Sequence, residues 1–268
     1  KEMAKREPTW EEVWFTGWVR PSGKLQTAIL ASKIGELDKE RLKGVKAAID
    51  TGEIGLGVES LRKFTKAHAL RLWRELQDRR KDTVLKEMVA NSPGNYRLIQ
   101  SEDQLEQVIV DLRNEPIIAF DTETTGLDVY RDVIVGMSLT LPKADYHVYI
   151  PVAHKVGKQL SRDRVLEWLR PMLENPTVGK VLHNAKYDMH MLIRHGVRMR
   201  GMVHDTRVAM ALLNENEPSY ALKNLATKYG RKFGFEDTSH TFYELFGKTR
   251  FDEVSLDVAL VYAAKDTH

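Results

Sequence analysis

The spacing of hydrophobic residues changes near residue 91 and divides the chain into two regions. Before this point, apolar residues recur every three or four positions, for example in residues 24–50 and 58–81, which predicts amphipathic helices. After it, short apolar runs of strand length are mixed with helical patterns. The turn-forming stretch NSPGN lies between the two regions and predicts a domain boundary, so we expect domains at residues 1–94 and 95–268.

The second region predicts an α/β domain. Patterns typical of strands occur at residues 96–100, 116–123, 134–141, 146–152 and 180–185. Helical patterns occur at residues 101–114, 161–175 and 186–196, and the rest of the chain is expected to be mostly helical. The first of these helices begins with Ser101 and has Gln104 at the capping-box position. Strands near the start and helices on the flanks indicate a mixed sheet covered by helices.

Composition excludes several classes of protein. The 268 residues, 42% of them hydrophobic, can fill a core, and no run approaches the roughly 20 apolar residues of a membrane helix. The charged N-terminus lacks the apolar core of a signal peptide, and the absence of cysteine excludes disulfides and thiolate chemistry. We therefore expect a soluble cytoplasmic protein with no membrane partner. Because the first residue is Lys, we also expect a piece of a longer chain.

The net charge of +3 is unevenly distributed. Residues 1–95 carry 19 Lys and Arg against 14 Asp and Glu, whereas residues 96–268 carry 22 against 24. A basic excess favours a polyanionic partner, although a solvated surface explains most of these charges. The first region is thus expected to be a helical, basic module, and its role is left open.

Two carboxylates end the predicted strand at residues 116–123. Asp121 and Glu123 are two positions apart, so their side chains point to the same face of the sheet. Such carboxylates repel each other unless a cation lies between them, and hard oxygen ligands suit Mg²⁺ or Mn²⁺. The pair alone is weak evidence, because Asp38 and Glu40 repeat it in a predicted surface helix.

Further acidic residues follow in ordinary settings. Asp188 begins a predicted helix, where the helix dipole favours a carboxylate. Tyr262 and Asp266 are four positions apart and share one face of a predicted helix near the end of the chain. Asp205 precedes a helix and is more typical of an N-cap than of a fifth site carboxylate.

Taken together and in order, these residues resemble the three motifs of the DEDD superfamily of 3′-5′ exonucleases, in its tyrosine-bearing branch. The histidine branch would need His at the position of Val261. The likeness is greatest to the proofreading domain of bacterial and phage family A DNA polymerases, the DNA polymerase I type. The stretches that carry it are AFDTETTGLD, NAKYDMHML, MVHDTRVAMALL, ALKNLATKYG, TFYELFGK and YAAKDTH, in order across residues 96–268.

The resemblance implies an RNase H-like fold and a two-metal site. In that pattern two divalent cations, Mg²⁺ or Mn²⁺, lie about 4 Å apart, one lowering the pKa of a water and the other stabilising the leaving 3′ oxygen. Tyr262 would orient the attacking water, since a hydroxyl with a pKa near 10 is a poor base at neutral pH. The four implied metal ligands are Asp121, Glu123, Asp188 and Asp266.

The resemblance also implies contacts with the substrate. Leu127 would wedge against the terminal base, Asn184 would lie near the scissile phosphate, and Phe242 would stack on a nucleotide. Core packing of Leu127 and Phe242, and a cap at Asn184, are equally compatible with the sequence. Thr122 and Tyr187 complete the implied substrate contacts. One departure is His183, where relatives often have Gln, and it leaves a polar contact to the substrate open.

The expected activity is removal of nucleoside 5′-monophosphates from DNA 3′ ends. The expected partners are a single-stranded or frayed DNA 3′ end and a polymerase domain that follows in the natural chain, in a monomer in a bacterial or phage-infected cell. An RNase D-like exoribonuclease and a catalytically silent DNA-binding module are the alternatives. Because Asp266 lies two positions from the last residue, we also expect its helix end to be frayed.

Overall fold

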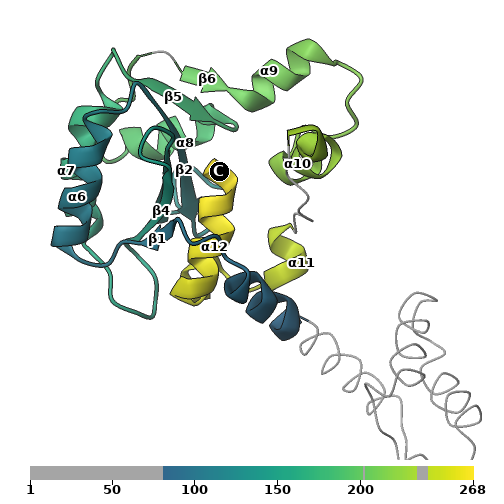
Figure 1. Cartoon of the computed structure of the whole chain (residues 1–268), viewed down its shortest axis with the longest axis horizontal. Coiled ribbons are helices and arrows are strands. Elements are labelled where there is room, and N and C mark those ends of the chain that lie inside the picture. Colours follow the sequence, from purple (N-terminus) through teal and green to yellow (C-terminus); the bar gives the residue numbers. More distant parts are fainter. Residues whose placement is uncertain (1–80, 202, 234–240) are drawn as a thin grey trace, which may run out of the picture. The chain divides into compact units, whose positions relative to one another are not determined.

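The computed structural model describes residues 81–201, 203–233 and 241–268 (Figure 1). The chain divides into two compact units, residues 1–83 and 84–268. The basic module expected at residues 1–94 lies almost entirely outside the described residues, so that module and its boundary stay predictions. Residues 81–90 are helical, and Val84, Leu85 and Met88 pack against a core of the second unit.

The second unit is built on a six-stranded sheet with the order β1-β4-β3-β2-β5-β6. The β2–β3 and β3–β4 pairs are antiparallel, whereas β1–β4, β2–β5 and β5–β6 are parallel, so the sheet is mixed as predicted. The strands are β1 (Tyr96–Leu98), β2 (Ile117–Thr124), β3 (Ile134–Leu141), β4 (Tyr146–Pro151), β5 (Gly179–Leu182) and β6 (Val203–Asp205). Five of them fall where the sequence predicts strands. The sixth, β6, was not predicted, because three residues are too few to show a period.

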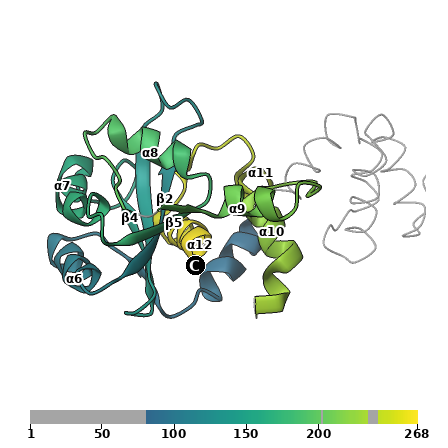
Figure 2. The ribbon, with the colours of Figure 1, turned by 90° about the horizontal axis from the view of Figure 1, so that it is seen from above.

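Helices cover both faces of the sheet, which confirms the predicted α/β class. The helices are α6 (Glu102–Leu112), α7 (Arg162–Leu173), α8 (Ala185–Ile193), α9 (Thr206–Leu213), α10 (Leu222–Tyr229), α11 (Phe242–Phe246) and α12 (Leu256–Thr267). The predicted capping box of α6 is present, since Ser101 accepts from the backbone of Gln104 and the Gln104 side chain accepts from Ser101. In two views, α6 and α7 lie on one side of the sheet and α12 on the other (Figures 1 and 2).

Two hydrophobic cores hold these layers. The larger core joins one face of the sheet to α6, α7 and α8 and includes Phe120, Leu169 and Leu192. The smaller core lies under α12 and includes Val135, Tyr149 and Phe251. Helix α12 packs across β1, β2, β3 and β4 and covers this part of the sheet with apolar side chains.

The smaller core requires a glycine on β3. Gly136 lies opposite Glu123 in the β2–β3 ladder, and the pairing register shifts between Glu123 and Thr124. A Cβ atom at Gly136 would overlap the hydroxyl of Tyr149, which is completely buried on β4. The missing side chain therefore makes room for the Tyr149 ring directly beneath the end of β2.

We predict that Gly136→Ala lowers the free energy of unfolding by about 1–3 kcal/mol, because the added methyl group overpacks a rigid core. Urea unfolding of the chain measures the change. Gly94→Ala is the matched control, because a Cβ atom there meets nothing within 4 Å. Equal stability of the two variants would show that Tyr149 can move aside at little cost.

Candidate active site

Three carboxylates converge at the end of β2. Asp121 and Glu123 leave β2 on the face that α12 covers, and α12 brings Asp266 to the same place. Ligand oxygens of these three residues lie within 4.8 Å of one another, and each side chain is partly buried. Residues 145 positions apart in sequence are thus brought together as the resemblance implies.

Helix α12 positions two of the predicted residues. It buries Leu256, Ala259 and Ala263 against the sheet, so Tyr262 and Asp266, one turn apart, both turn toward β2. The helix runs to Thr267, and the N–H of His268 donates to the carbonyl of Ala264 at 3.0 Å. The expected fraying is therefore wrong for this structure, because the packing of α12 on the sheet holds Asp266 beside Asp121.

Asp188 lies apart from the group of three and is held by Thr122. The Thr122 N–H donates to Asp188 Oδ1 at 2.9 Å, and the Thr122 hydroxyl donates to the same oxygen at 2.6 Å. Asp188 is buried, and burial followed by the charge of Asp121 raises its pKa well above the usual range. Thr122, which the resemblance places near the substrate, here fixes the direction of an acidic side chain.

Burial strongly perturbs the carboxylates of the site. Burial raises the pKa of Asp121 to about 6, although the Lys223 ammonium and the Thr122 N–H both lower it. Burial also raises the pKa of Glu123 to about 8, with further increases from Asp121 and Asp188 and a decrease from Lys223. A positive charge placed among these oxygens would relieve this unfavourable burial.

Lys223 on α10 supplies such a positive charge. Its Nζ forms an ion pair with Asp266 Oδ1, and both side chains are 14% exposed. The same ammonium lies over the ring of Tyr262, 4.2 Å from its centroid. Lys223 lies in the stretch ALKNLATKYG, but no role at the site was predicted for it, because its contact joins residues 43 positions apart on two different helices.

Tyr262 is buried in an aromatic cluster. Its ring centroid lies 5.6 Å from that of Phe246, 5.9 Å from that of Phe251 and 6.0 Å from that of Phe242. Burial, then Glu123 and Asp121, raise the pKa of its hydroxyl above the usual range, so the group stays protonated. Phe242 is partly buried against this cluster, which is the packing role that the sequence left open.

The loop after β2 holds Leu127 in an exposed position. Leu127 is 88% exposed, which excludes core packing for this side chain. The hydroxyl of Tyr187 donates to the carbonyl of Gly126 at 2.7 Å, and the hydroxyl of Thr124 does the same. Tyr187 therefore fixes the loop next to Leu127.

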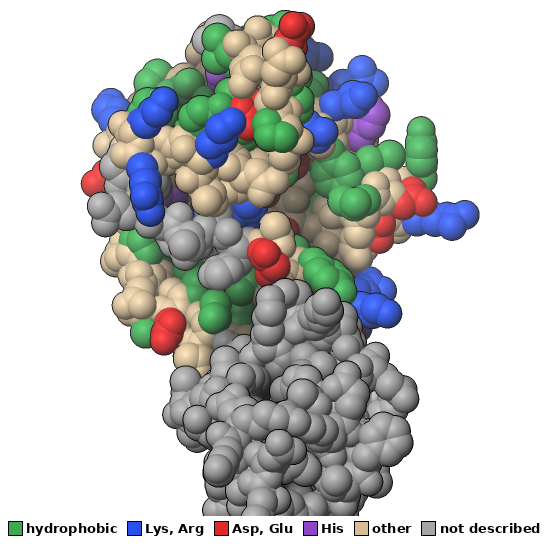
Figure 3. Space-filling view, turned by 90° about the vertical axis from the view of Figure 1, so that its right-hand side faces the viewer, with side chains coloured by type: hydrophobic (Ala, Val, Ile, Leu, Met, Phe, Trp, Pro, Cys, Tyr) green, Lys and Arg blue, Asp and Glu red, His purple; other side chains and the backbone are tan. Residues whose placement is uncertain are grey.

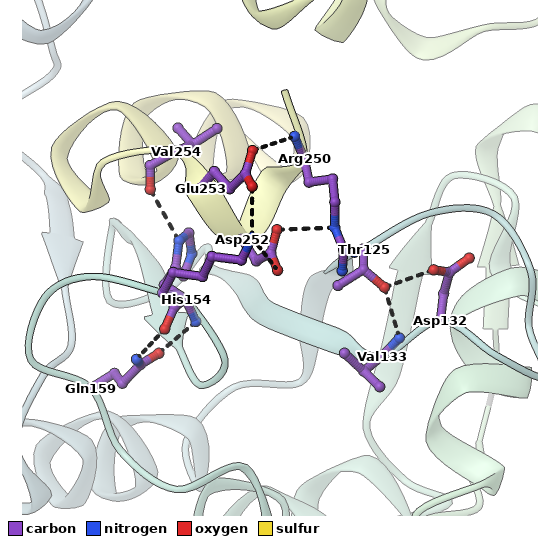
Figure 4. Close-up of polar contacts among 10 residues, drawn as sticks. Thr125, Asp132, Val133, His154, Gln159, Arg250, Asp252, Glu253 and Val254 are labelled. Carbon is purple, nitrogen blue, oxygen red and sulfur yellow. Dashed lines mark hydrogen bonds and ion pairs between the residues drawn. The ribbon is translucent and has the colours of Figure 1, made fainter. Parts of the chain in front are cut away.

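Asp132 closes the other side of this loop. The hydroxyl of Thr125 donates to Asp132 Oδ1 at 2.7 Å and accepts from the N–H of Val133 at 3.1 Å (Figure 4). The N–H of Asp128 donates to the second oxygen of Asp132 at 2.8 Å. These bonds and those to the carbonyl of Gly126 fix the conformation of the loop that carries Leu127.

A second set of polar contacts in Figure 4 supports the start of α12. His154 shares one hydrogen bond with the carbonyl of Val254 at 3.1 Å and another with the hydroxyl of Tyr149 at 2.6 Å. Arg250 pairs with Asp252 at 3.2 Å, just ahead of the helix. The segment before α12 is thereby tied to β4, and this tie sets where Tyr262 and Asp266 arrive.

Asp205 caps two helices, which confirms the predicted cap. One oxygen accepts from the N–H groups of Arg207 and Val208 in the first turn of α9. The same carboxylate accepts from the N–H of Asn184 at 3.0 Å and of Ala185 at 2.8 Å, at the start of α8. Asn184 has a left-handed backbone, with φ of 71°, and its side chain makes no capping bond.

His183 has structural partners on both ring nitrogens. It shares hydrogen bonds with the hydroxyl of Thr206 and the carbonyl of Tyr220, each at 2.9 Å. His183 therefore joins the end of β5 to two neighbouring segments. Whether it also contacts a substrate stays open.

A cavity of about 490 Å³ lies beside the carboxylates. It is bounded by β2, β5, α10 and the end of α12, and its walls include Asp121, Lys223 and Asp266. Most other lining side chains are apolar, among them Leu222, Leu225 and Phe233. The side of the molecule that faces right in Figure 1, where α9, α10 and α11 lie, displays hydrophobic side chains interspersed with basic and acidic ones (Figure 3).

The donor set fits a hard divalent cation. Asp121, Glu123 and Asp266 offer carboxylate oxygens alone, which Mg²⁺ and Mn²⁺ prefer over softer metals. Burial raises the pKa of Asp121 and of Glu123, so their ionised forms would be stabilised by a bound cation. The described residues therefore support a divalent metal site at this place.

Comparison with known proteins gives a consistent result. The model of the DNA polymerase A 3′-5′ exonuclease family matches residues 96–268. DNA polymerase I of Pseudomonas aeruginosa is 31% identical over 181 residues, which is 64% of this chain and 19% of that protein. DNA polymerase I of Chloroflexus aurantiacus is 34% identical over 178 residues, 65% of this chain and 18% of that protein. The chain thus spans about a fifth of the length of these curated relatives.

A phage relative and a solved structure extend the comparison. DNA polymerase DpoZ of Salmonella phage PMBT28 is 35% identical over 138 residues, 51% of this chain and 21% of that protein. Among solved structures, Escherichia coli RNase D aligns with a TM-score of 0.47 and 20% identity, covering 65% of this chain and 41% of that chain.

We predict that Glu123→Gln stabilises the metal-free protein more at pH 9 than at pH 5. The folded protein holds the Glu123 proton more tightly than the unfolded chain, so its contribution is complete below the ordinary pKa and lost as the pH rises through about 8. Gln removes that loss, with a gain of about 1–3 kcal/mol at pH 9. Urea unfolding with a chelator at both pH values measures the difference; an equal difference at the two pH values would contradict it.

Proposed function

The chain belongs to the 3′-5′ exonuclease family of family A DNA polymerases, and from this premise we propose that it proofreads DNA. Specifically, residues 96–268 remove nucleoside 5′-monophosphates from a DNA 3′ end. The observation that supports this most directly is the convergence of Asp121, Glu123 and Asp266 within 4.8 Å in a chain of this family. A proofreading role further supposes a polymerase domain in the natural chain, as in the relatives.

The acidic residues would hold two divalent cations, Mg²⁺ or Mn²⁺. When bound, such ions supply an activated water and stabilise the leaving 3′ oxygen. Asp121, Glu123 and Asp266 offer the converging oxygens, and Asp188 offers the carboxylate oxygen that Thr122 leaves unbonded. Tyr262 keeps its proton, so its hydroxyl orients the attacking water by hydrogen bonding and does not act as the base.

Several residues would position the DNA end. Leu127 stands exposed on the loop that Tyr187 holds, where it can press against the last base. Asn184 keeps its side-chain amide clear of capping bonds and can reach a phosphate oxygen. Phe242 is partly exposed and its ring packs against that of Tyr262, so we retain it as a contact for a splayed nucleotide.

We also propose a cellular setting for this activity. No helix in residues 81–201, 203–233 and 241–268 is both long and apolar enough to cross a membrane. The relatives are bacterial and phage DNA polymerases, which favours the cytoplasm of a bacterial or phage-infected cell. We expect a monomer, and residues 1–94 carry the basic excess that would suit DNA.

We predict that the chain releases mononucleotides from a DNA 3′ end only when Mg²⁺ or Mn²⁺ is added. Asp121→Asn and Asp266→Asn should each lower this rate by about a thousandfold or more, because each removes a converging ligand. Chromatography of products from an end-labelled single strand measures the rate. Asp257→Asn is the control, because Asp257 lies in the first turn of the same helix, away from the carboxylates.

The same assay discriminates the alternatives. A DNA strand hydrolysed faster than an RNA strand of the same sequence supports the proofreading role, whereas the reverse preference supports an RNase D-like enzyme. A folded protein that binds DNA but releases no nucleotide with either metal would be a silent binding module and would sink the proposal.

A second prediction concerns the hydroxyl of Tyr262. Tyr262→Phe should lower kcat by about tenfold to a hundredfold and leave KM nearly unchanged, because it removes a water-orienting group and keeps the buried ring. Steady-state rates at saturating Mg²⁺ test this. A larger effect on KM than on kcat would assign Tyr262 to substrate binding.

A further inference from the structure

Lys223 occupies a place where a metal ion would compete with it. Its ammonium is paired with an oxygen of Asp266, one of the converging carboxylates, and this pair is largely shielded from water. An ammonium and a divalent cation seek the same oxygens, and Mg²⁺ needs its ligands at about 2.0–2.1 Å in a strict octahedral arrangement. Asp266 Oδ1 cannot serve both partners at once.

The position of Lys223 is determined by more than one contact. The ring of Tyr262 lies under the ammonium, and a cation over an aromatic face is attracted to it. The positive charge also lowers the pKa of both Asp121 and Glu123. Lys223 therefore interacts with several groups of the site, although it lies on α10 and the acidic residues lie on other elements.

The surroundings leave room for Lys223 to move. The cavity of about 490 Å³ next to the site is lined by Lys223 itself and by neighbouring residues of α10. A lysine has a flexible four-carbon stem that packs along apolar walls while its ammonium stays near water. No residue of α10 is fully buried, so the helix can accommodate a new rotamer of Lys223 without breaking a core.

We propose that Lys223 is a tethered counter-ion, which fills the cation position of the carboxylate cluster in the metal-free protein and is displaced into the adjacent cavity when a divalent ion binds. This inference rests on the proposed metal site. Lys223 would keep the carboxylates close together before the metal arrives and would lower the apparent affinity for the metal. The protein would thus require a higher free metal concentration than its acidic residues alone would need.

The first test is metal binding without DNA. Isothermal titration of the whole chain with Mn²⁺ should show that Lys223→Met binds the ion about tenfold more tightly or better, because one competing positive charge is removed. Lys228→Met is the matched control: Lys228 lies on the same helix but pairs with Glu217 at 2.8 Å, and its removal should leave the affinity unchanged. An unchanged or weaker affinity in Lys223→Met would overturn the proposal.

The second test uses the unmodified protein and does not depend on how a variant folds. Reductive methylation followed by peptide mass spectrometry should find Lys223 protected in chelator and reactive after addition of Mn²⁺, while Lys228 reacts equally in both conditions. Protection of Lys223 that persists with bound Mn²⁺ would show that the ion pair survives and would refute displacement. Failure of Mn²⁺ to bind at all would instead overturn the metal site, and the inference with it.

Discussion

Burial of closely spaced carboxylates, away from water, is the constraint on which this structure depends. Oxygens of Asp121, Glu123 and Asp266 come within 4.8 Å, and burial raises the pKa of Glu123 to about 8. Bringing three carboxylates together in a buried site lowers the stability of the fold, so contacts elsewhere must hold the three side chains in place. The two cores, the Lys223 ion pair and the bonds from Thr122 to Asp188 all oppose the tendency of the site to open.

Helix α12 contributes most to holding the site together, because it covers one face of the sheet and also supplies Asp266. The face of α12 that buries Ala259 and Ala263 also fixes the direction of Asp266 one turn later. Small side chains let the helix approach the sheet closely, and Gly136 lets the Tyr149 ring lie beneath it. A mutation that alters this packing would therefore also displace Asp266. On this helix, a loss of stability and a loss of activity are expected to occur together.

Much of the sheet and of the acidic site follows from local patterns. The strands at Ile134–Leu141 and Tyr146–Pro151 are continuous apolar runs, and the motif order around Asp121, Asp188 and Asp266 specifies a family. Strand β6 has only three residues and no detectable period. The contact of Lys223 with Asp266 and that of Thr122 with Asp188 depend on how distant elements meet, which no spacing in one segment can express.

The double cap at Asp205 affects how mutational data on this protein should be interpreted. One carboxylate accepts N–H groups from the starts of α8 and α9, and α8 carries Asp188. Removing that carboxylate would leave several backbone donors without a partner and would let α8 rotate. Asp205 would then score as essential in a screen for activity although it lies outside the group of converging carboxylates. Loss of activity at an acidic position is therefore not sufficient to identify a ligand in this fold.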